Sequence, residues 1–122
     1  MSGPTLTVVI PTFNQCALVL ECLRSLGAQT VRPDCTIVVD DGSTEDIAER
    51  VNRDFPDVRV LRLSNNRGFC GAANAGLHAA TTQYVFLLNN DMTLDRECIA
   101  ELKRRARPDT IATPLVLFKD DP

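Results

Sequence analysis

Residues 36–46 read TIVVDDGSTED, and this stretch decides the fold that the sequence predicts. Its first four residues form an apolar, β-branched run with the length of a buried strand. Aspartate and glycine then indicate a turn. Ser43 or Thr44 can cap a helix, and the two acidic residues that follow favour its positive N-terminal end. The stretch therefore predicts one strand–turn–helix unit.

The same alternation of short apolar runs and helix-period segments continues on both sides of this unit. Pro11 is expected to end the first strand, and Pro114 suits a strand at the edge of a sheet. Apolar strands separated by helices imply a parallel sheet covered on both faces, so the predicted class is α/β with an open, mostly parallel, doubly wound sheet. The predicted strands are 6–10, 36–39, 58–63 (alternating, as at an edge), 84–88 and 111–118; the predicted helices are 16–28, 43 to just before Pro56, the alanine-rich segment that ends near Ala80, and 95–105.

The composition is that of a single soluble domain. The chain has 122 residues, of which 44% are hydrophobic and 24% charged, and its formal net charge is -3. Its dense basic cluster, at 103–105, lies among acidic residues, so no nucleic-acid partner is expected. No apolar run approaches the roughly 18 residues of a transmembrane segment. The five cysteines are odd in number and lack Cys-x-x-Cys spacing, which favours reduced thiols in a cytoplasmic protein.

Polar residues that favour turns follow each of the first four predicted strands. In open α/β sheets the ligand lies beyond the carboxyl ends of the strands, so these residues should converge on one edge. Their convergence indicates a site more strongly than any single motif does. The four segments are Pro11-Thr12-Phe13-Asn14, Asp40-Asp41-Gly42-Ser43, Ser64-Asn65-Asn66-Arg67-Gly68 and Asn89-Asn90-Asp91.

Each segment also has a purely structural alternative. Asp40 and Asp41 can belong to a strand-ending turn, and Thr12 and Asn14 can cap the first helix. The glycines and alanines of the third helix suit close packing on the sheet. His78, the only histidine, is expected to be a surface or packing residue, so neither a catalytic triad nor a zinc site is indicated.

The chemistry that fits the whole set is the binding of a nucleoside diphosphate. A carboxylate can accept a hydrogen bond from a base, Phe13 offers the base a packing surface, and polar side chains can hold a ribose. Asp91, with two amides beside it, suits a hard cation that is completed by water and phosphate oxygens. Neither Gly-x-Gly-x-x-Gly after the first strand nor a P-loop pattern occurs, which disfavours nicotinamide-dependent redox and P-loop ATPase functions.

Together the motifs resemble those of the family 2 inverting glycosyltransferases, which have the GT-A fold. The resemblance covers nearly the whole chain, in the family's order and spacing. Within the family, the forms at 66–76 and 87–91 look most like bacterial rhamnosyltransferases. The matching stretches are TVVIPTFNQ (7–15), IVVDDGSTED (37–46), NNRGFCGAANAGLHAA (65–80) and YVFLLNNDMTLD (84–95).

The resemblance implies a role for each matching residue. Asp41, with Asp40 beside it, would face the base, most simply its N3–H. Residues 89–91 occupy the place of the family's Asp-x-Asp signature, so Asp91 would bind Mg²⁺ or Mn²⁺ that bridges the donor diphosphate and offsets charge on the leaving group. The implied nucleotide-binding residues are Pro11, Thr12, Phe13, Asp40, Asp41, Asn66, Gly68, Ala72, Asn74, Asn89 and Asn90.

The sequence departs from the family pattern in two ways. Asn89 replaces the first signature carboxylate, so metal affinity in the absence of donor should be modest. The family's catalytic base and acceptor surface lie in the second half of the domain, so residues 1–122 are expected to be a truncated, nucleotide-sugar-binding part without the acceptor-binding half. The catalytic base is unknown, and neither Asp120 nor Asp121 is assigned to it. In a complete enzyme, an acceptor hydroxyl would attack the anomeric carbon of a UDP- or dTDP-sugar with inversion.

One other function stays open, and a second is disfavoured. A non-catalytic or degenerate module for nucleotide binding or oligomerisation is favoured by Asn89 and the missing half, because exposed apolar surface on a truncated sheet promotes homo-oligomers. A phospho-acceptor signalling domain would need its acid pair after the first strand, and a further aspartate and a lysine after later strands. It is disfavoured, because the acid pair follows the second strand and no lysine occurs before Lys103. For the transferase, the expected setting is polysaccharide biosynthesis in the cytoplasm, in solution or at the membrane surface. The sequence does not specify whether the acceptor is a sugar, a lipid-linked molecule or a protein.

Overall fold

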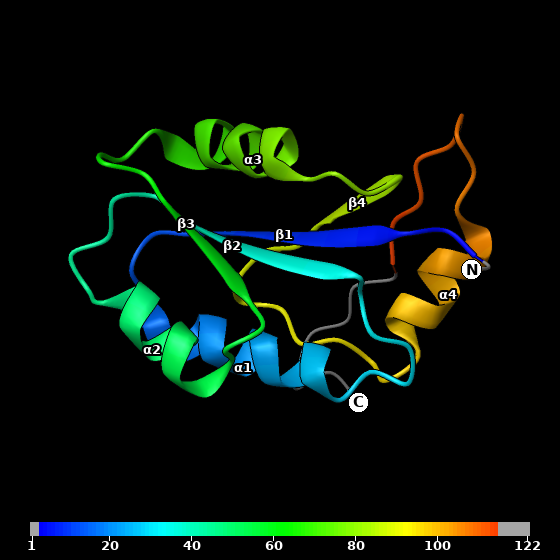
Figure 1. The fold of residues 1–122 in the computed structure, drawn as a ribbon, viewed down its shortest axis with the longest axis horizontal. Coiled ribbons are helices and arrows are strands. Elements are labelled where there is room, and N and C mark those ends of the chain that lie inside the picture. The colour runs from blue at the N-terminus through cyan, green and yellow to red at the C-terminus, as the bar shows by residue number, and fades with distance from the viewer. Residues whose placement is uncertain (1–2, 115–122) are drawn as a thin grey trace, which may run out of the picture.

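The structure is a computed structural model that describes residues 3–114. Its four strands form one parallel sheet in the order β3-β2-β1-β4, with α3 on one face and α1 and α2 on the other (Figure 1). The predicted open, doubly wound α/β fold is confirmed. The elements are β1 (Leu6–Thr12), α1 (Cys16–Gly27), β2 (Cys35–Asp40), α2 (Ile47–Asp54), β3 (Arg59–Arg62), α3 (Gly68–Ala79), β4 (Tyr84–Leu87) and α4 (Cys98–Arg105).

Two cores, one on each face of the sheet, hold the helices in place. Successive strand residues point to opposite faces, and every residue of β1 is buried. Val8 and Ile10 pack in the larger core with the apolar faces of α1 and α2. Val9 packs in the smaller core with Ala72 of α3. Burial on both faces explains why β1 is a continuous apolar run rather than an alternating one.

The smaller core is thin because α3 lies very close to the sheet. A Cβ atom built on Gly76 would lie 2.3 Å from Cγ1 of Val9 and 3.0 Å from Cγ2 of Val39. Only a glycine fits this contact without a shift of the helix. The close-packing interpretation of the small residues is therefore confirmed at Gly76.

Strand β1 is two residues longer than predicted, because Pro11 does not end it. Pro11 pairs with Val39 in the register of β2. On the other side, the carbonyl of Val9 accepts from the N–H of Leu88. Successive residues of β1 form their hydrogen bonds alternately with β2 and with β4, so the nitrogen of Pro11, like the carbonyl of Val9, faces β4. At that level β4 has already ended, and the missing N–H of Pro11 therefore breaks no hydrogen bond of the sheet.

The two edge strands of the sheet are β3, which was predicted to be an edge, and β4, which was not. β3 is an edge strand, as its alternating pattern indicated. β4 was expected to be buried on both faces, but it is the other edge strand of the described sheet, and Leu87 is 40% exposed. Residues 111–114 form no strand, and residues 115–118 of the predicted fifth strand lie outside the described residues.

The start of helix α4 is fixed to the segment that follows α1 by the buried side chain of Gln29. Gln29 donates from Nε2 to the carbonyl of Asp95 at 2.7 Å, and its Oε1 accepts from the N–H of Ile99 at 3.0 Å. The second bond satisfies a helix N-terminal N–H that has no partner within the helix. Ile99 itself is fully buried. Between residues 3 and 114, none of the helices combines the length and the apolar character needed to cross a bilayer.

Candidate functional site

The loop between β1 and α1 has an unusual backbone conformation. Asn14 and Gln15 have φ values of 54° and 59°, in the left-handed region. Asparagine tolerates this region, whereas glutamine adopts it only rarely. Such strain persists where surrounding contacts fix the backbone, and it occurs preferentially at functional sites.

The side chain of Asn14 fixes this loop to the loop that follows β2. Its Oδ1 accepts from the backbone N–H groups of Thr44 at 2.9 Å and Glu45 at 3.1 Å, and its own N–H donates to Oγ of Ser43 at 2.7 Å. Ser43 and Thr44 were predicted to cap α2, and this prediction is wrong. The cap is Asp46, whose carboxylate accepts from the N–H of Glu49 at 3.1 Å.

Asp41 fixes a third loop, the one between β3 and α3. Its Oδ1 accepts from the N–H of Arg67 at 2.7 Å, and its Oδ2 accepts from the N–H of Gly68 at 3.0 Å. The carboxylate is 4% exposed and stabilises the N-terminal end of α3, where a negative charge is favourable. The loop also packs on Gly42, where a Cβ atom would lie 2.8 Å from the backbone of Asn65.

Asp40 is fully buried and does not line the cavity described below. Its Oδ1 accepts from the N–H of Ser43 at 3.0 Å, and its Oδ2 lies 3.7 Å from Nη1 of Arg62 on β3. The carboxylate therefore shapes the turn after β2 from inside the fold. Its predicted contact with a nucleotide stays a prediction.

The segment that follows β4 is bound to the β1–α1 loop. Asn90 donates from Nδ2 to Oγ1 of Thr12 at 2.9 Å and to Oε1 of Gln15 at 3.1 Å. Asn89 and Asp91 flank it and are exposed. Burial, and secondarily the charge of Asp91, raises the pKa of the Cys22 thiol beneath this segment to about 12.

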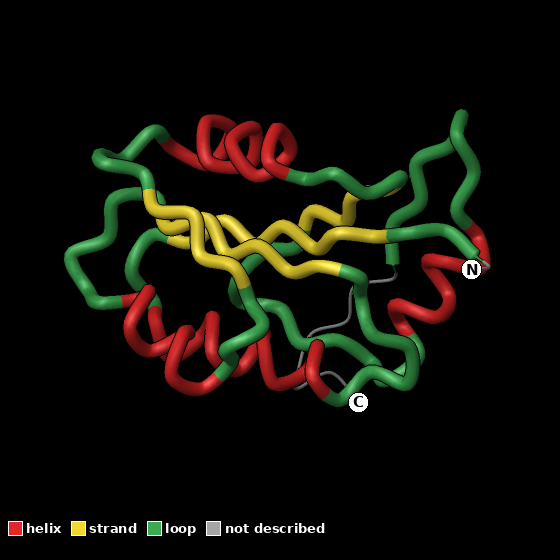
Figure 2. The backbone as a smooth tube through the Cα atoms, in the orientation of Figure 1, coloured by secondary structure: helices red, strands yellow, loops and turns green. Residues whose placement is uncertain are grey.

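The loops that follow β1, β2 and β3 gather at one end of the sheet (Figure 2). With the β4 end they surround a cavity of about 420 Å³, and none of the residues that line it is basic. Asn74, Asn89 and Asp91 lie outside the lining, as Asp40 does. The lining residues are Pro11, Thr12, Phe13, Gln15, Asp41, Asn66, Gly68, Phe69, Ala72 and Asn90.

Gln15 and Phe69 are the two lining residues that the sequence analysis missed. Phe69 could have been found from the helical spacing, since it is the one large side chain in the stripe that includes Ala72 and Gly76. Gln15 carries no such signal, because its contact with Asn90 depends on a left-handed backbone that the sequence does not indicate.

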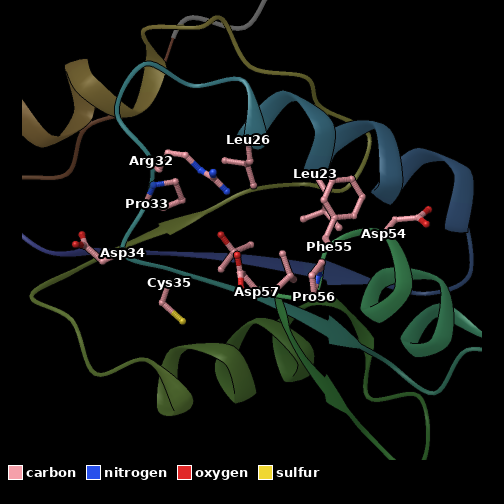
Figure 3. Close-up of a pocket in the computed structure, with 13 residues that line it drawn as sticks. Leu23, Leu26, Arg32, Pro33, Asp34, Cys35, Asp54, Phe55, Pro56 and Asp57 are labelled. Carbon is pink, nitrogen blue, oxygen red and sulfur yellow. The ribbon is translucent and has the colours of Figure 1, made fainter.

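A larger cavity, of about 500 Å³, lies at the opposite end of the sheet between the end of α1 and the α2–β3 connection (Figure 3). Leu23, Leu26 and Phe55 give it apolar walls. Three aspartates and one arginine also line it, so its charge disfavours an anionic ligand. It lies at the amino ends of β2 and β3, whereas ligands of open α/β sheets bind at the carboxyl ends. We therefore take the smaller cavity as the candidate site.

Comparison with known proteins connects this chain to a family. The family model described as "Glycosyl transferase family 2" matches residues 7–118. The chain belongs to this family. Its α/β fold is that of the GT-A glycosyltransferases.

Relatives of this family 2 domain are glycosyltransferases of greater length. Glycosyltransferase GlyG of Streptococcus pneumoniae is 29% identical over 105 residues, which are 84% of this chain and 35% of that protein. A PGL/p-HBAD biosynthesis glycosyltransferase of Mycobacterium tuberculosis is 29% identical over 77% of this chain and 38% of its own length. The chain thus spans about a third of these relatives.

Two solved structures share the fold of this family 2 domain. Mannosyltransferase PcManGT from Pyrobaculum calidifontis, in complex with GDP-Man and Mn²⁺, has a TM-score of 0.75 and 29% identity, over 88% of this chain and 34% of its own. Staphylococcus aureus TarS 1-349, in complex with UDP, has a TM-score of 0.72 and 26% identity, over 80% of this chain and 30% of its own.

Proposed function

We propose that this family 2 domain binds the nucleoside diphosphate of a UDP- or dTDP-sugar at the carboxyl edge of its sheet. The observation that carries the proposal is the convergence of three strand ends and the start of α3 on one cavity. Side chains fix the surrounding loops by accepting from backbone N–H groups and, between Asn90 and Thr12, by a bond between two side chains. Fixed polar groups around a concave site are what a small-molecule ligand requires.

A divalent cation is part of the proposal because the diphosphate needs a positive partner that the cavity lining lacks. Asp91 follows the lining residue Asn90 and is exposed, so it is the carboxylate that would hold Mg²⁺ or Mn²⁺. Over residues 3–114 no cluster of three or more His, Cys, Asp or Glu side chains is arranged to hold a metal. One carboxylate with amides beside it fits a cation that takes most of its ligands from water and phosphate. The ion and the nucleotide should therefore bind together, and the ion would neutralise the diphosphate.

In this proposal the chain's own residues position the donor. Phe13 packs on the base, and Asn66 and Gly68 face the nucleotide from the loop that Asp41 fixes. Asn74 and Asn89 are proposed to reach the donor from outside the cavity lining. Sugar transfer with inversion, polysaccharide biosynthesis and a cytoplasmic location are proposed for the whole enzyme. The motif forms at 66–76 and 87–91 favour a rhamnosyl donor.

We further propose that residues 1–122 are the nucleotide-sugar-binding part of the enzyme and that the catalytic base and acceptor site lie outside them. The greater length of the relatives supports this division. The acceptor is left unassigned.

Titration calorimetry with UDP and Mn²⁺ tests the binding proposal. The chain should bind UDP with Mn²⁺ and lose at least tenfold in affinity with EDTA or in the Asp91→Asn variant, because the diphosphate charge is then unbalanced. Glu21→Gln, which removes an exposed carboxylate from α1, is the matched control and should change nothing. Equal UDP affinity in the Asp91→Asn variant and the unmodified chain would refute the metal assignment.

One observation favours the alternative, a module for oligomer contacts. Within the described residues, β4 has no strand on its outer side, and Leu87 is exposed there. An open apolar edge strand can pair with another chain. Sedimentation equilibrium separates the two functions, since a dimer that binds no nucleotide supports the module and a nucleotide-binding monomer excludes it.

A further inference from the structure

The connection between β4 and α4 carries Asp91 and contains no helix or strand. It runs along α1 before it reaches α4 (Figure 1). Met92 and Leu94 pack against the larger core, while Asp91 and Thr93, which alternate with them, are exposed. Backbone groups that form no helix or sheet bonds need other partners where they are buried. The position of Asp91 therefore depends on what holds this connection.

One side of α1 supplies partners to the connection. Oγ of Ser25 accepts from the N–H of Leu94 at 3.1 Å and donates to the carbonyl of Cys22 at 2.7 Å. Sγ of Cys22, one turn earlier on α1, lies 3.9 Å from the carbonyl oxygen of Asn89. Residues three apart share one side of a helix, so both contacts fall on the same side of α1. Helix α1 thus contacts the chain both before and after Asp91.

Gln29 extends this contact beyond the end of α1. Its Nε2 donates to the carbonyl of Ser25 at 3.1 Å as well as to that of Asp95, and its Oε1 accepts from the N–H of Ile99. The side chain is buried, and both of its polar atoms have partners. A buried polar network with such partners specifies one arrangement of the chain. Ser25 and Gln29 therefore fix the β4–α4 connection by defined hydrogen bonds rather than by apolar packing alone.

We propose that Ser25 and Gln29 are positioning residues for the cation: they hold the backbone that follows Asp91, so that its carboxylate meets the cation and the diphosphate together. The inference rests on the proposed function of Asp91 and adds two residues that lie outside the cavity lining. Asn90 already holds the chain on the other side of Asp91. Residues that orient a metal ligand without binding the metal typically contribute about 10–100-fold to metal affinity or activity.

Titration calorimetry of the chain with UDP and Mn²⁺ tests the inference. Ser25→Ala removes the acceptor for Leu94 and should weaken UDP binding about tenfold, the lower end of that range. Alanine favours the helix, so α1 itself should persist. Ser25→Thr keeps the hydroxyl and should restore most of the affinity. Gln29→Met keeps the length of the side chain without its hydrogen bonds, and it should weaken UDP binding as Ser25→Ala does.

Two further measurements separate positioning of Asp91 from a general loss of stability. If Ser25 acts through Asp91, the effects of the two residues do not add, so Ser25→Ala should cause no further loss of UDP affinity in the Asp91→Asn variant. Val51→Ala is the matched control, because it removes buried methyl groups from α2 in the same core. It should lower the urea midpoint and leave UDP affinity unchanged.

Three results would overturn the inference while leaving nucleotide binding intact. They are unchanged UDP affinity in both Ser25→Ala and Gln29→Met, a full additional loss when Ser25→Ala is combined with Asp91→Asn, and an equal loss of UDP affinity in Val51→Ala. A chain that binds no UDP in the presence of Mn²⁺ would overturn the proposed function together with this inference.

Discussion

Asn90, beyond the end of β4, donates from Nδ2 to Oγ1 of Thr12, the last residue of β1, across 2.9 Å and 78 positions of sequence. Thr12 is buried, and its hydroxyl donates in turn to the carbonyl of Asn14. A buried hydroxyl needs such partners to offset its loss of water. The pair therefore sets where the Asn89–Asp91 segment lies relative to the β1–α1 loop.

Thr12→Val should show how much the hydrogen bonds of the Thr12 hydroxyl contribute to stability and to nucleotide binding. Valine has the same shape but removes both hydrogen bonds and leaves Asn90 with one partner fewer, so the free energy of unfolding should fall by about 1–3 kcal/mol. Metal-dependent UDP affinity should fall as well, because Asp91 follows Asn90. Urea unfolding and calorimetry measure the two effects. Thr81→Val, at an exposed position, is the control, and equal effects of the two substitutions would contradict the prediction.

Asn14→Ala should be more harmful than Asn14→Asp. Alanine loses the acceptor for Thr44 and Glu45 and is strained at a φ of 54°, so a loss of about 2 kcal/mol or more is expected. Aspartate keeps an acceptor oxygen and tolerates the left-handed region, so it should restore most of the stability and of the UDP affinity. Failure of aspartate to rescue either quantity would show that the Asn14 side chain does not fix the loop through its oxygen.

Gly76→Ala and Gly27→Ala form a matched pair for the contact between α3 and the sheet. The methyl group at position 76 would overlap Val9, so α3 must move outward, at a cost of about 1–3 kcal/mol. A methyl group at position 27 meets nothing within 4 Å, and the change in the free energy of unfolding there should stay within about 0.5 kcal/mol. Comparable urea midpoints for the two variants would contradict the close approach seen at Gly76.

The fold could be predicted because its signals are local. The apolar runs and helical periods each identify their own element, and the polar residues at the strand ends then follow from the topology. What could not be predicted depends on distant partners. Strand β1 continues through Pro11 because β4 ends before it would need a hydrogen bond from that position. The cap of α2 is Asp46 rather than Ser43, because the hydroxyl of Ser43 accepts from the N–H of Asn14.

The lining of the candidate cavity was predicted in outline for the same reason, but the hydrogen bonds among its residues were not. Phe13 and Asn90 follow strands, and Pro11 precedes the last residue of β1, so the sequence places all three at the cavity. The engagement of Asp41 with the N–H groups of Arg67 and Gly68 requires the three-dimensional path of the β3–α3 loop. A strand-end carboxylate has the same sequence pattern whether it faces a ligand or a loop.

The pH dependence of stability should include a contribution from Asp34. The ammonium of Lys103, with the N–H of Leu6, lowers the pKa of this carboxyl below its ordinary value. A carboxyl with a lowered folded-state pKa stabilises the fold above its unfolded pKa, and this stabilisation is lost as the pH falls through the folded-state pKa. The stability difference between the unmodified chain and Asp34→Asn should therefore be constant from about pH 5 to 8 and shrink below about pH 4. Urea unfolding at a series of pH values measures it, and a difference that widens in acid would be the opposite result.

The thiols should differ strongly in reactivity. Burial raises the pKa of Cys22 to about 12, whereas Cys70 is exposed on α3. Because the thiolate is the reactive form, a disulfide reagent at pH 8 should modify Cys70 quickly and Cys22 only when the chain unfolds. Cys70→Ser should remove the fast phase. A fast phase that survives this substitution would assign it to another cysteine.

Five backbone N–H groups in the loops that follow the strands each donate to a side chain of another segment. They belong to Asn14, Thr44, Glu45, Arg67 and Gly68. Loops with such partners have lost their conformational entropy during folding rather than during ligand binding. Nucleotide binding should consequently order little further backbone. Hydrogen exchange at these five positions should already be slow in the free chain. The free energy of donor binding should then come from contacts with the donor, with little of it spent on ordering the loops around the cavity.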